Sequence, residues 1–184
     1  LPLESEYPLL RRNQIVFTYF HFAAVPSLVE ACKKSGAICI AYETVQTRDG
    51  QLPLLAPMSE VAGRMAVQEG AKYLERAMGG RGILLGGVPG VAPANVAIIG
   101  GGMVGTEAAK VAAGMGANVT VLDVSLPRLR YLNDVMPRNV TTLYANSGTI
   151  RDSVIAADLV IGAVLIRGAK APTLVPAALV GSMK

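Results

Sequence analysis

The chain has 184 residues, of which 52% are hydrophobic and only 16% are charged, so it can bury enough apolar surface to fold and is not a disordered protein. Its 17 lysine and arginine residues against 13 acidic residues give a net charge of +4, and the scattered positive charges argue against a nucleic-acid-binding protein. The apolar stretch 82–105 resembles a membrane span in hydropathy, but its prolines and glycines would break a spanning helix, so we expect no membrane segment.

The two cysteines give information about the cellular compartment. Cys32 and Cys39 stand seven residues apart, which matches neither a redox CxxC pair nor a set of metal ligands. We therefore expect two buried, reduced thiols, no bound metal and a cytoplasmic protein.

Residues 1–56 have the pattern of a strand–helix–strand unit. The apolar and aromatic run at 15–20 predicts a buried strand, and Pro26 opens a helix that Gly36 ends. A second strand is predicted at 37–42. We expect these residues to be part of an α/β domain separate from the rest of the chain.

Residues 57–78 predict a long helix that connects two domains. Its apolar residues recur at intervals of three and four, and Pro57 marks its start. Glu60 and Arg64 stand one helical turn apart, which predicts an ion pair between them.

Residues 79–184 predict a Rossmann-type doubly wound parallel sheet. Strands are expected at 95–99, 119–122, 140–144 and 159–163, and helices at 103–115, 127–135, 149–157 and 176–184. Six glycines between 79 and 90 predict tight turns or close backbone contacts, and we expect this run to shape the approach to a bound nucleotide. A last helix with no strand after it is incomplete for this fold, so we expect a domain truncated before its next strand.

The strongest functional motif is a glycine fingerprint at a predicted strand–helix turn. Gly100 allows a tight turn, Gly102 lets a pyrophosphate approach the helix N-terminus, and Gly105 permits close helix–strand packing. Asp123 ends the next strand, where its carboxylate would accept hydrogen bonds from the adenosine ribose. That favours NAD over NADP, although Arg128 five residues later weakens the preference. The alternative is a tight turn without a ligand.

His21 is the single histidine and follows a predicted strand. Open α/β sheets bind ligands at the carboxyl ends of strands, so His21 is a candidate proton acceptor for oxidation of a C–OH or C–NH₂ centre; the alternative is a packed or surface imidazole.

Met58 and Ser59 could face a cleft between domains; alternatively, Met58 is a core residue and Ser59 is a helix cap. The dipeptide 164–165 could contact a nicotinamide ribose or be buried.

Four segments, at 17–24, 41–64, 79–110 and 158–172, resemble the bacterial NAD-dependent L-alanine dehydrogenases, and the resemblance covers almost the whole chain. Members of that family reversibly deaminate L-alanine to pyruvate and ammonium, usually as homohexamers. The resemblance implies that residues 1–56 belong to the substrate domain, that His21 is the acid/base, and that Met58 lines the substrate pocket. The cofactor contacts that it implies are Ser59, Met103, Val104, Asp123, Arg128, Val164 and Leu165.

Some features of that family fall outside this sequence or differ in it. Its substrate-binding arginine and lysine would precede residue 1, and its catalytic aspartate would follow Lys184, so we expect these 184 residues alone to be inactive. Ala145 stands where the family often has a serine near the adenine. Two alternatives stay open: the nucleotide-binding part of a proton-translocating NAD(P) transhydrogenase, and a non-catalytic NAD(H)-binding module.

Overall fold

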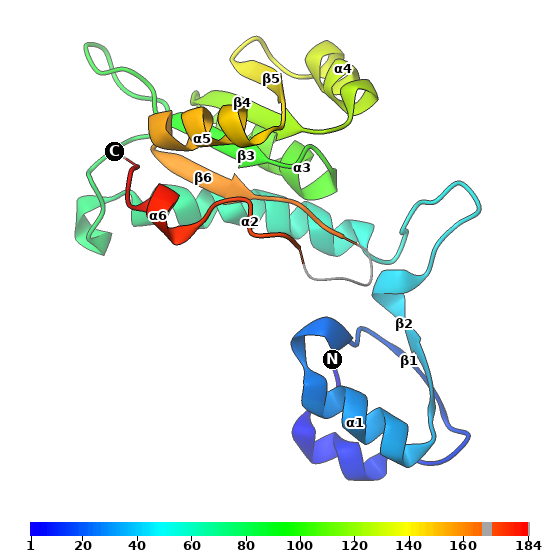
Figure 1. The fold of residues 1–184 in the computed structure, drawn as a ribbon. Coiled ribbons are helices and arrows are strands. Elements are labelled where there is room, and N and C mark those ends of the chain that lie inside the picture. The colour runs from blue at the N-terminus through cyan, green and yellow to red at the C-terminus, as the bar shows by residue number, and fades with distance from the viewer. Residues whose placement is uncertain (167–170, 184) are drawn as a thin grey trace. The chain divides into compact units, whose positions relative to one another are not determined.

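The computed structural model describes residues 1–166 and 171–183, which form two compact units (Figure 1). The first is built around Leu1–Met58 and the second around Ser59–Leu165. The division into a domain at 1–56, a connecting helix at 57–78 and a nucleotide-binding domain at 79–184 stays a prediction about the whole protein.

The first unit is a pair of parallel strands with a crossover helix. Strand β1 (Ile15–Thr18) pairs with β2 (Ile38–Ala41), and helix α1 (Pro26–Ser35) connects them. Gly36 ends α1 in a left-handed conformation with φ of 69°. Short 3-10 turns complete the unit: η1 (Glu4–Leu9), η2 (Phe22–Ala24) and η3 (Tyr42–Thr44).

The prediction of a buried strand at 15–20 is wrong in extent and in burial. The strand ends at Thr18, and its burial alternates along the chain. One face contributes Val16 to a small core around Phe20 and Leu28, whereas Ile15 and Phe17 on the other face are 66% and 49% exposed. A strand covered by a helix on only one face alternates in this way.

Both cysteines of this unit are free thiols. Cys32 is buried, as predicted, while Cys39 is only partly buried. Burial and the neighbouring Cys39 thiol raise the pKa of Cys32 to about 11. Cys32 is therefore protonated and weakly nucleophilic at neutral pH.

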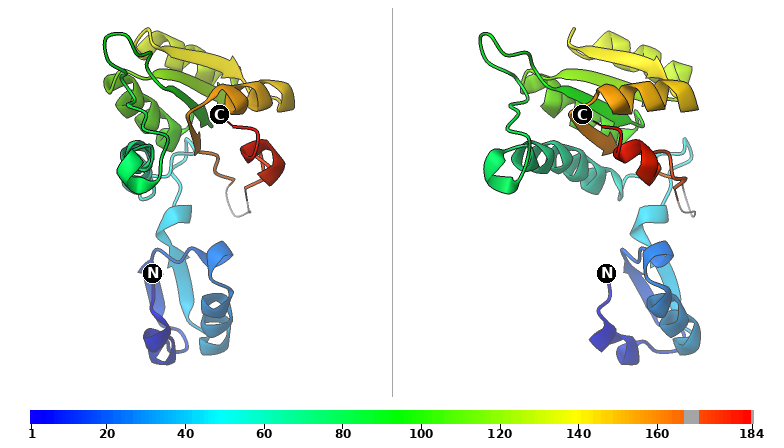
Figure 2. Two further views of the ribbon diagram at one scale, coloured as in Figure 1. Left: turned by 90° about the vertical axis from the view of Figure 1, so that its left-hand side faces the viewer. Right: turned by 60° about the vertical axis from the view of Figure 1, so that its left-hand side comes forward.

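The second unit is a doubly wound parallel sheet, which confirms the predicted fold class (Figure 2). Its four strands lie in the order β5-β4-β3-β6. The strands are β3 (Asn95–Ile99), β4 (Asn118–Asp123), β5 (Val140–Tyr144) and β6 (Leu159–Gly162). The helices are α2 (Ala56–Tyr73), α3 (Met103–Gly114), α4 (Leu126–Val135), α5 (Ser147–Ala156) and α6 (Ala177–Val180), with a 3-10 turn η4 (Arg76–Met78).

Helices cover both faces of this sheet (Figures 1 and 2). On one face, side chains of α2, α3 and α4 join Val96 and Ile98 of β3 in the larger core. On the other face, α5 and α6 cover Ile99 and Leu122. The successive crossovers thus place α3 and α4 on one side and α5 on the other, as a change of winding direction requires.

Helix α2 packs directly on α3 through a glycine. A Cβ at Gly63 would lie 2.3 Å from the carbonyl oxygen of Val104, so only glycine permits this approach. The neighbouring Arg64 forms an ion pair of 2.7 Å with Glu107 of α3. The predicted pair of Glu60 with Arg64 is therefore wrong, because a buried carboxylate on the facing helix takes the arginine instead.

The glycine run at 79–90 does contact backbone closely, but not near the fingerprint loop. A Cβ at Gly86 would lie 2.5 Å from the carbonyl oxygen of Met115. The Ala94 amide that follows the run donates to Leu85, and Ala94 accepts from Asn118. These residues lie where β3 and β4 begin, whereas Gly100 follows the end of β3. The expectation that this run shapes the approach to a nucleotide is therefore wrong.

The last helix is shorter than the predicted 176–184, since α6 covers only Ala177–Val180 and ends at Gly181; Lys184 lies outside the described residues. Across the part of the chain that the structure describes, no helix combines the length and the apolar character needed to cross a bilayer.

We predict that Gly63→Ala lowers the free energy of unfolding by about 1–3 kcal/mol, because the added methyl group would push α2 away from α3. Urea unfolding followed by circular dichroism measures the change. Gly114→Ala is the matched control, since a Cβ at this helical glycine has no protein atom within 4 Å. Equal stabilities of the two variants would contradict the role of the Gly63 contact.

Candidate functional site

The fingerprint glycines form a tight loop between β3 and α3. Gly100 has φ of 107°, and its amide donates to the carbonyl of Leu122 at 2.7 Å. A Cβ at Gly105 would lie 1.8 Å from the Gly100 carbonyl oxygen, so the helix approaches the strand as closely as backbone allows. A Cβ at Gly102 would meet no protein atom within 4 Å. The N-terminus of α3 therefore opens onto free space.

This opening suits an anionic group. The first amides of an α-helix lack intrahelical partners and carry the positive end of the helix dipole. No side chain caps α3 at Gly102. Met103 is exposed and Val104 partly buried in the first turn of the helix. The loop can thus hold a pyrophosphate against backbone amides.

The loop lies at the topological switch point of the sheet. Strand β3 pairs with β4 on one side and with β6 on the other, so the winding direction reverses between β3 and β6. A Cβ at Gly100 would lie 3.1 Å from a methyl carbon of Val164, which follows β6. Ligands of open α/β sheets bind at this point. Leu165, the next residue, is 65% exposed.

Asp123 is bonded to the same loop from the end of β4. Its Oδ2 accepts a hydrogen bond of 2.6 Å from the Gly101 amide, and its Oδ1 accepts one of 2.8 Å from Ser125. A carboxylate can accept about four hydrogen bonds, so both oxygens retain capacity for ribose hydroxyls. The structure therefore brings Asp123 to the glycine loop, as a dinucleotide site requires.

Arg128 contacts the carbonyl group of Gly101, the residue whose amide donates to Asp123. Its Nε donates to the Gly101 carbonyl at 2.6 Å, and its Nη2 donates to the Thr106 hydroxyl at 2.5 Å. Thr106 in turn donates to the Gly102 carbonyl at 2.7 Å. The guanidinium also lies over the ring of Tyr131 at 4.9 Å. Arg128 thus reaches the predicted site through the loop backbone.

Two further predicted residues lie on segments that contact this loop or Asp123. Ser59 is partly buried on α2, one helical turn before Gly63, whose close contact is the Val104 carbonyl. Ala145 follows β5, and its amide donates to the Asp123 carbonyl at 2.9 Å. Its methyl group offers no hydrogen bond at the position expected to face the adenine.

His21 lies in the first unit, in a left-handed backbone conformation that is uncommon for residues other than glycine. Its φ of 49° and ψ of 44° are left-handed. For an L-residue this conformation costs about 1–2 kcal/mol. Glu43 compensates, because its Oε1 accepts a hydrogen bond of 2.6 Å from the His21 amide. The imidazole stacks at 6.2 Å on the ring of Tyr19 and is partly buried.

Met58 is the last residue of the first unit and is 40% exposed. His21 and Met58 belong to one unit, and the glycine loop belongs to the other. Among residues 1–166 and 171–183, no cluster of three or more histidine, cysteine or acidic side chains is arranged for a metal ion.

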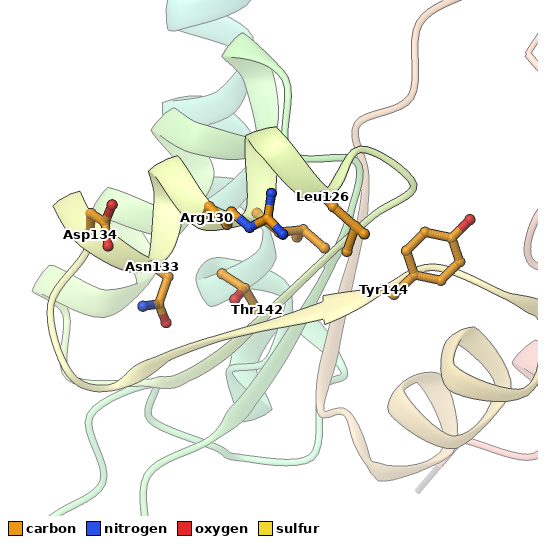
Figure 3. Close-up of a pocket in the computed structure, with 7 residues that line it drawn as sticks. Leu126, Arg130, Asn133, Asp134, Thr142 and Tyr144 are labelled. Carbon is orange, nitrogen blue, oxygen red and sulfur yellow. The ribbon is translucent and has the colours of Figure 1, made fainter.

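A separate pocket lies between α4 and β5 (Figure 3). Asn133 on the helix and Thr142 on the strand point into the same space, and Tyr144 lies at the end of the strand. None of the predicted site residues lines this pocket. The glycine loop remains the better candidate, because its open amides and neighbouring carboxylate match a definite ligand chemistry.

Sequence reasoning missed two polar residues of these sites. Thr106 links Arg128 to the loop, and its place one turn after Gly102 in a helix was a usable signal, since threonine hydroxyls there bond to the preceding turn. Glu43 follows β2, and the parallel pairing of Thr18 with Ala41 brings the ends of both strands to one edge. That topology could have indicated a contact between Glu43 and His21.

Comparison with known proteins gives a consistent result over the whole chain. The family model "Alanine dehydrogenase/PNT, N-terminal domain" matches residues 1–62, and "Alanine dehydrogenase/PNT, C-terminal domain" matches residues 66–184. Alanine dehydrogenase of Methanococcus maripaludis is 57% identical over 183 residues, and that of Bacillus subtilis is 55% identical. Both alignments include 100% of this chain but only 49% and 48% of the relatives, so the chain spans about half their length.

Solved structures show the same fold. A structure of L-alanine dehydrogenase is 54% identical with a TM-score of 0.87, and the match covers 100% of this chain and 51% of that one. A transhydrogenase from Sinorhizobium meliloti has a TM-score of 0.75 at 22% identity, covering 100% of this chain and 54% of that one. At this identity the second likeness concerns the fold alone.

Glu107, the acidic residue that joins α2 to α3, should make the stability of the fold depend on pH. Glu107 is 5% exposed and is bonded to Lys110 at 2.6 Å and to Arg64. The hydrogen bond from Lys110, with the further contribution of Arg64, outweighs burial and lowers the pKa of Glu107 below its usual value of 4.5. Its stabilising contribution is therefore complete above pH 4.5 and is lost as the pH falls through the lowered pKa.

We predict that Glu107→Gln lowers the free energy of unfolding at pH 7 by about 1–3 kcal/mol, because two charge-assisted contacts are lost. The difference from the unsubstituted protein should shrink as the pH falls below the lowered pKa. Denaturant unfolding at several pH values measures both effects, with exposed Glu60→Gln as control. A difference that stayed constant down to low pH would refute the assignment.

Proposed function

We propose that the protein containing this chain oxidises L-alanine to pyruvate and ammonium with NAD as hydride acceptor, since the chain belongs to the alanine dehydrogenase/PNT family. The observation that carries this proposal is the glycine loop at the switch point, with Asp123 bonded to it. The high identity to proteins named alanine dehydrogenase supports the choice of substrate.

The residues of the second unit would bind and orient the cofactor. The first amides of α3 and the open backbone at Gly102 would hold the pyrophosphate, and Asp123 would accept the ribose hydroxyls. Val164 and Leu165 would offer an apolar surface to the nicotinamide ribose. The proposed set of contacts is Ser59, Gly100, Gly102, Met103, Val104, Gly105, Asp123, Arg128, Val164 and Leu165.

The residues of the first unit would serve the substrate. NAD, when bound by the second unit, would supply the acceptor for the hydride of the alanine α-carbon. A ring nitrogen of His21 would accept the proton that leaves the amino group or the attacking water, and would return it in the reverse direction. Met58 would line the pocket around the small side chain of the substrate. We further propose a homohexameric enzyme in the cytoplasm.

An assay of the whole protein for alanine-dependent formation of NADH tests the proposal. NADH should appear when alanine and NAD are present, and ammonium with pyruvate should consume it. Hydride exchange between NADH and NADP without alanine activity would favour a transhydrogenase instead. Binding of NADH with neither activity would indicate a non-catalytic module.

We predict that His21→Ala in the whole protein lowers kcat for deamination by about 100-fold or more, because the proton acceptor is removed. The dissociation constant for NADH, measured by fluorescence titration, should stay within about 2-fold, equivalent to less than 0.5 kcal/mol. Retained turnover would remove His21 from the mechanism.

We predict that Asp123→Ala raises the KM for NAD by about 10- to 100-fold, because hydrogen bonds to a charged acceptor are lost. The preference for NAD over NADP should fall, since the carboxylate no longer repels a 2′-phosphate. Steady-state kinetics with both cofactors measure the ratio. The control is Asp152→Ala on α5, whose side chain is 78% exposed. An unchanged preference would count against Asp123.

A further inference from the structure

We propose that Glu43 is a positioning residue for His21: its carboxylate holds the left-handed turn that presents the imidazole. The proposal rests on the proposed function, in which His21 moves the proton. Glu43 itself would touch neither substrate nor cofactor and would act only through His21.

The turn at His21 needs an external support. Among residues 1–166 and 171–183, Asn13 is the only other residue besides glycine with a positive φ. A strained backbone of this kind persists only where the surrounding structure fixes it, and such strain is concentrated at functional sites.

Glu43 provides this support with one carboxylate for two consecutive amides. Oε1 accepts from the His21 amide at 2.6 Å and from the Phe20 amide at 3.2 Å, and Oε2 lies 3.3 Å from the Phe20 amide. Two amides that converge on one acceptor fix the peptide between them. Neither amide takes part in the pairing of β1 with β2, which ends at Thr18 and Ala41.

The register of the sheet delivers Glu43 to this place. Because β1 and β2 are parallel and end together, the residues after each strand meet at one edge. The chain turns after β2 in the 3-10 segment Tyr42–Thr44, where the Thr44 hydroxyl donates to the Ala41 carbonyl at 2.9 Å. This turn directs Glu43 back toward the end of β1.

Neighbouring aromatic rings hold the side chains around the turn. Phe20 is fully buried and stacks on Phe22 with 4.6 Å between ring centroids. Tyr19 lies nearly parallel to the imidazole, at 10°, and its hydroxyl donates to the Leu54 carbonyl at 2.6 Å. The rings are thus held by packing and by the Tyr19 hydroxyl, and Glu43 is the group bonded to the His21 amide.

The carboxylate is held in its charged form. Burial alone would raise the pKa of Glu43, but hydrogen bonds from backbone amides, including those of His21 and Phe20, outweigh burial and lower it. At neutral pH the bonds to the turn are therefore charge-assisted, which makes them shorter and stronger than bonds between neutral groups.

Two substitutions of Glu43 distinguish the effect of losing the hydrogen-bond acceptor from the effect of changing the side-chain volume. Glu43→Gln keeps an amide oxygen that can accept both bonds, whereas Glu43→Leu keeps a similar volume without an acceptor. In the whole protein we expect Glu43→Leu to lower kcat by about 100-fold, the effect of misplacing a reacting group by an ångström. Glu43→Gln should recover most of that loss. The KM for NAD and the dissociation constant for NADH should not change in either variant.

Combining Glu43→Leu with His21→Ala makes the test specific. If Glu43 acts through His21, then Glu43→Leu should not lower the residual rate of His21→Ala any further, because the group that it positions is already absent. Glu30→Gln is the control for loss of a carboxylate in the same unit, since Glu30 is 58% exposed and should leave kcat unchanged. Circular dichroism establishes that each variant is folded.

The inference is overturned if kcat of folded Glu43→Leu equals that of the unsubstituted protein, or if the losses from Glu43→Leu and His21→Ala multiply. A loss of both turnover and NADH binding would also overturn it, because such a loss would show that Glu43 has a general structural role. A failure of the proposed function has a different signature, in which the unsubstituted protein itself forms no NADH from alanine.

Discussion

Helix α3 starts where it does because of one contact, between Gly105 and the carbonyl oxygen of Gly100. With no side chain at Gly105, the helix lies against the end of β3, and its N-terminus stays open at Gly102. The other elements of the second unit build on this arrangement. Helix α2 lies on α3 through Gly63, and β6 reaches the same loop beside Val164. A larger residue at Gly105 would displace the helix and with it the amides that form the candidate site.

The parts of this structure that depend on local sequence could be predicted. Runs rich in apolar and β-branched residues identified the four strands of the second unit, and their alternation with helical patterns indicated a doubly wound sheet. The spacing of the fingerprint glycines located the loop, and the position of Asp123 after β4 placed its carboxylate there. These signals suffice because each follows from the geometry of a single strand–helix crossover.

Contacts between elements distant in the sequence could not be predicted in the same way. The spacing of four residues on one helix predicts a pair of Arg64 with Glu60. This spacing takes no account of Glu107, which lies on α3, a helix that comes later in the chain and packs against α2. The glycine run before β3 lies at the edge of the sheet opposite to the one expected. Its composition indicates close backbone contacts but does not indicate at which end of the strands these contacts lie. The residues around Glu43 form no motif, and its contact with His21 follows only from the parallel register that brings the ends of both strands to one edge.

The engagement of Arg128 has a consequence for how cofactor choice could evolve in this fold. Rossmann proteins that use a 2′-phosphorylated dinucleotide commonly place an arginine beside that phosphate. Here the Nε and one terminal nitrogen of Arg128 are already bonded to the loop and to Thr106. The orientation of this cation is therefore set by the loop, and a lineage that lost Asp123 would have to use the N–H donors of Arg128 that remain free in order to bind a 2′-phosphate.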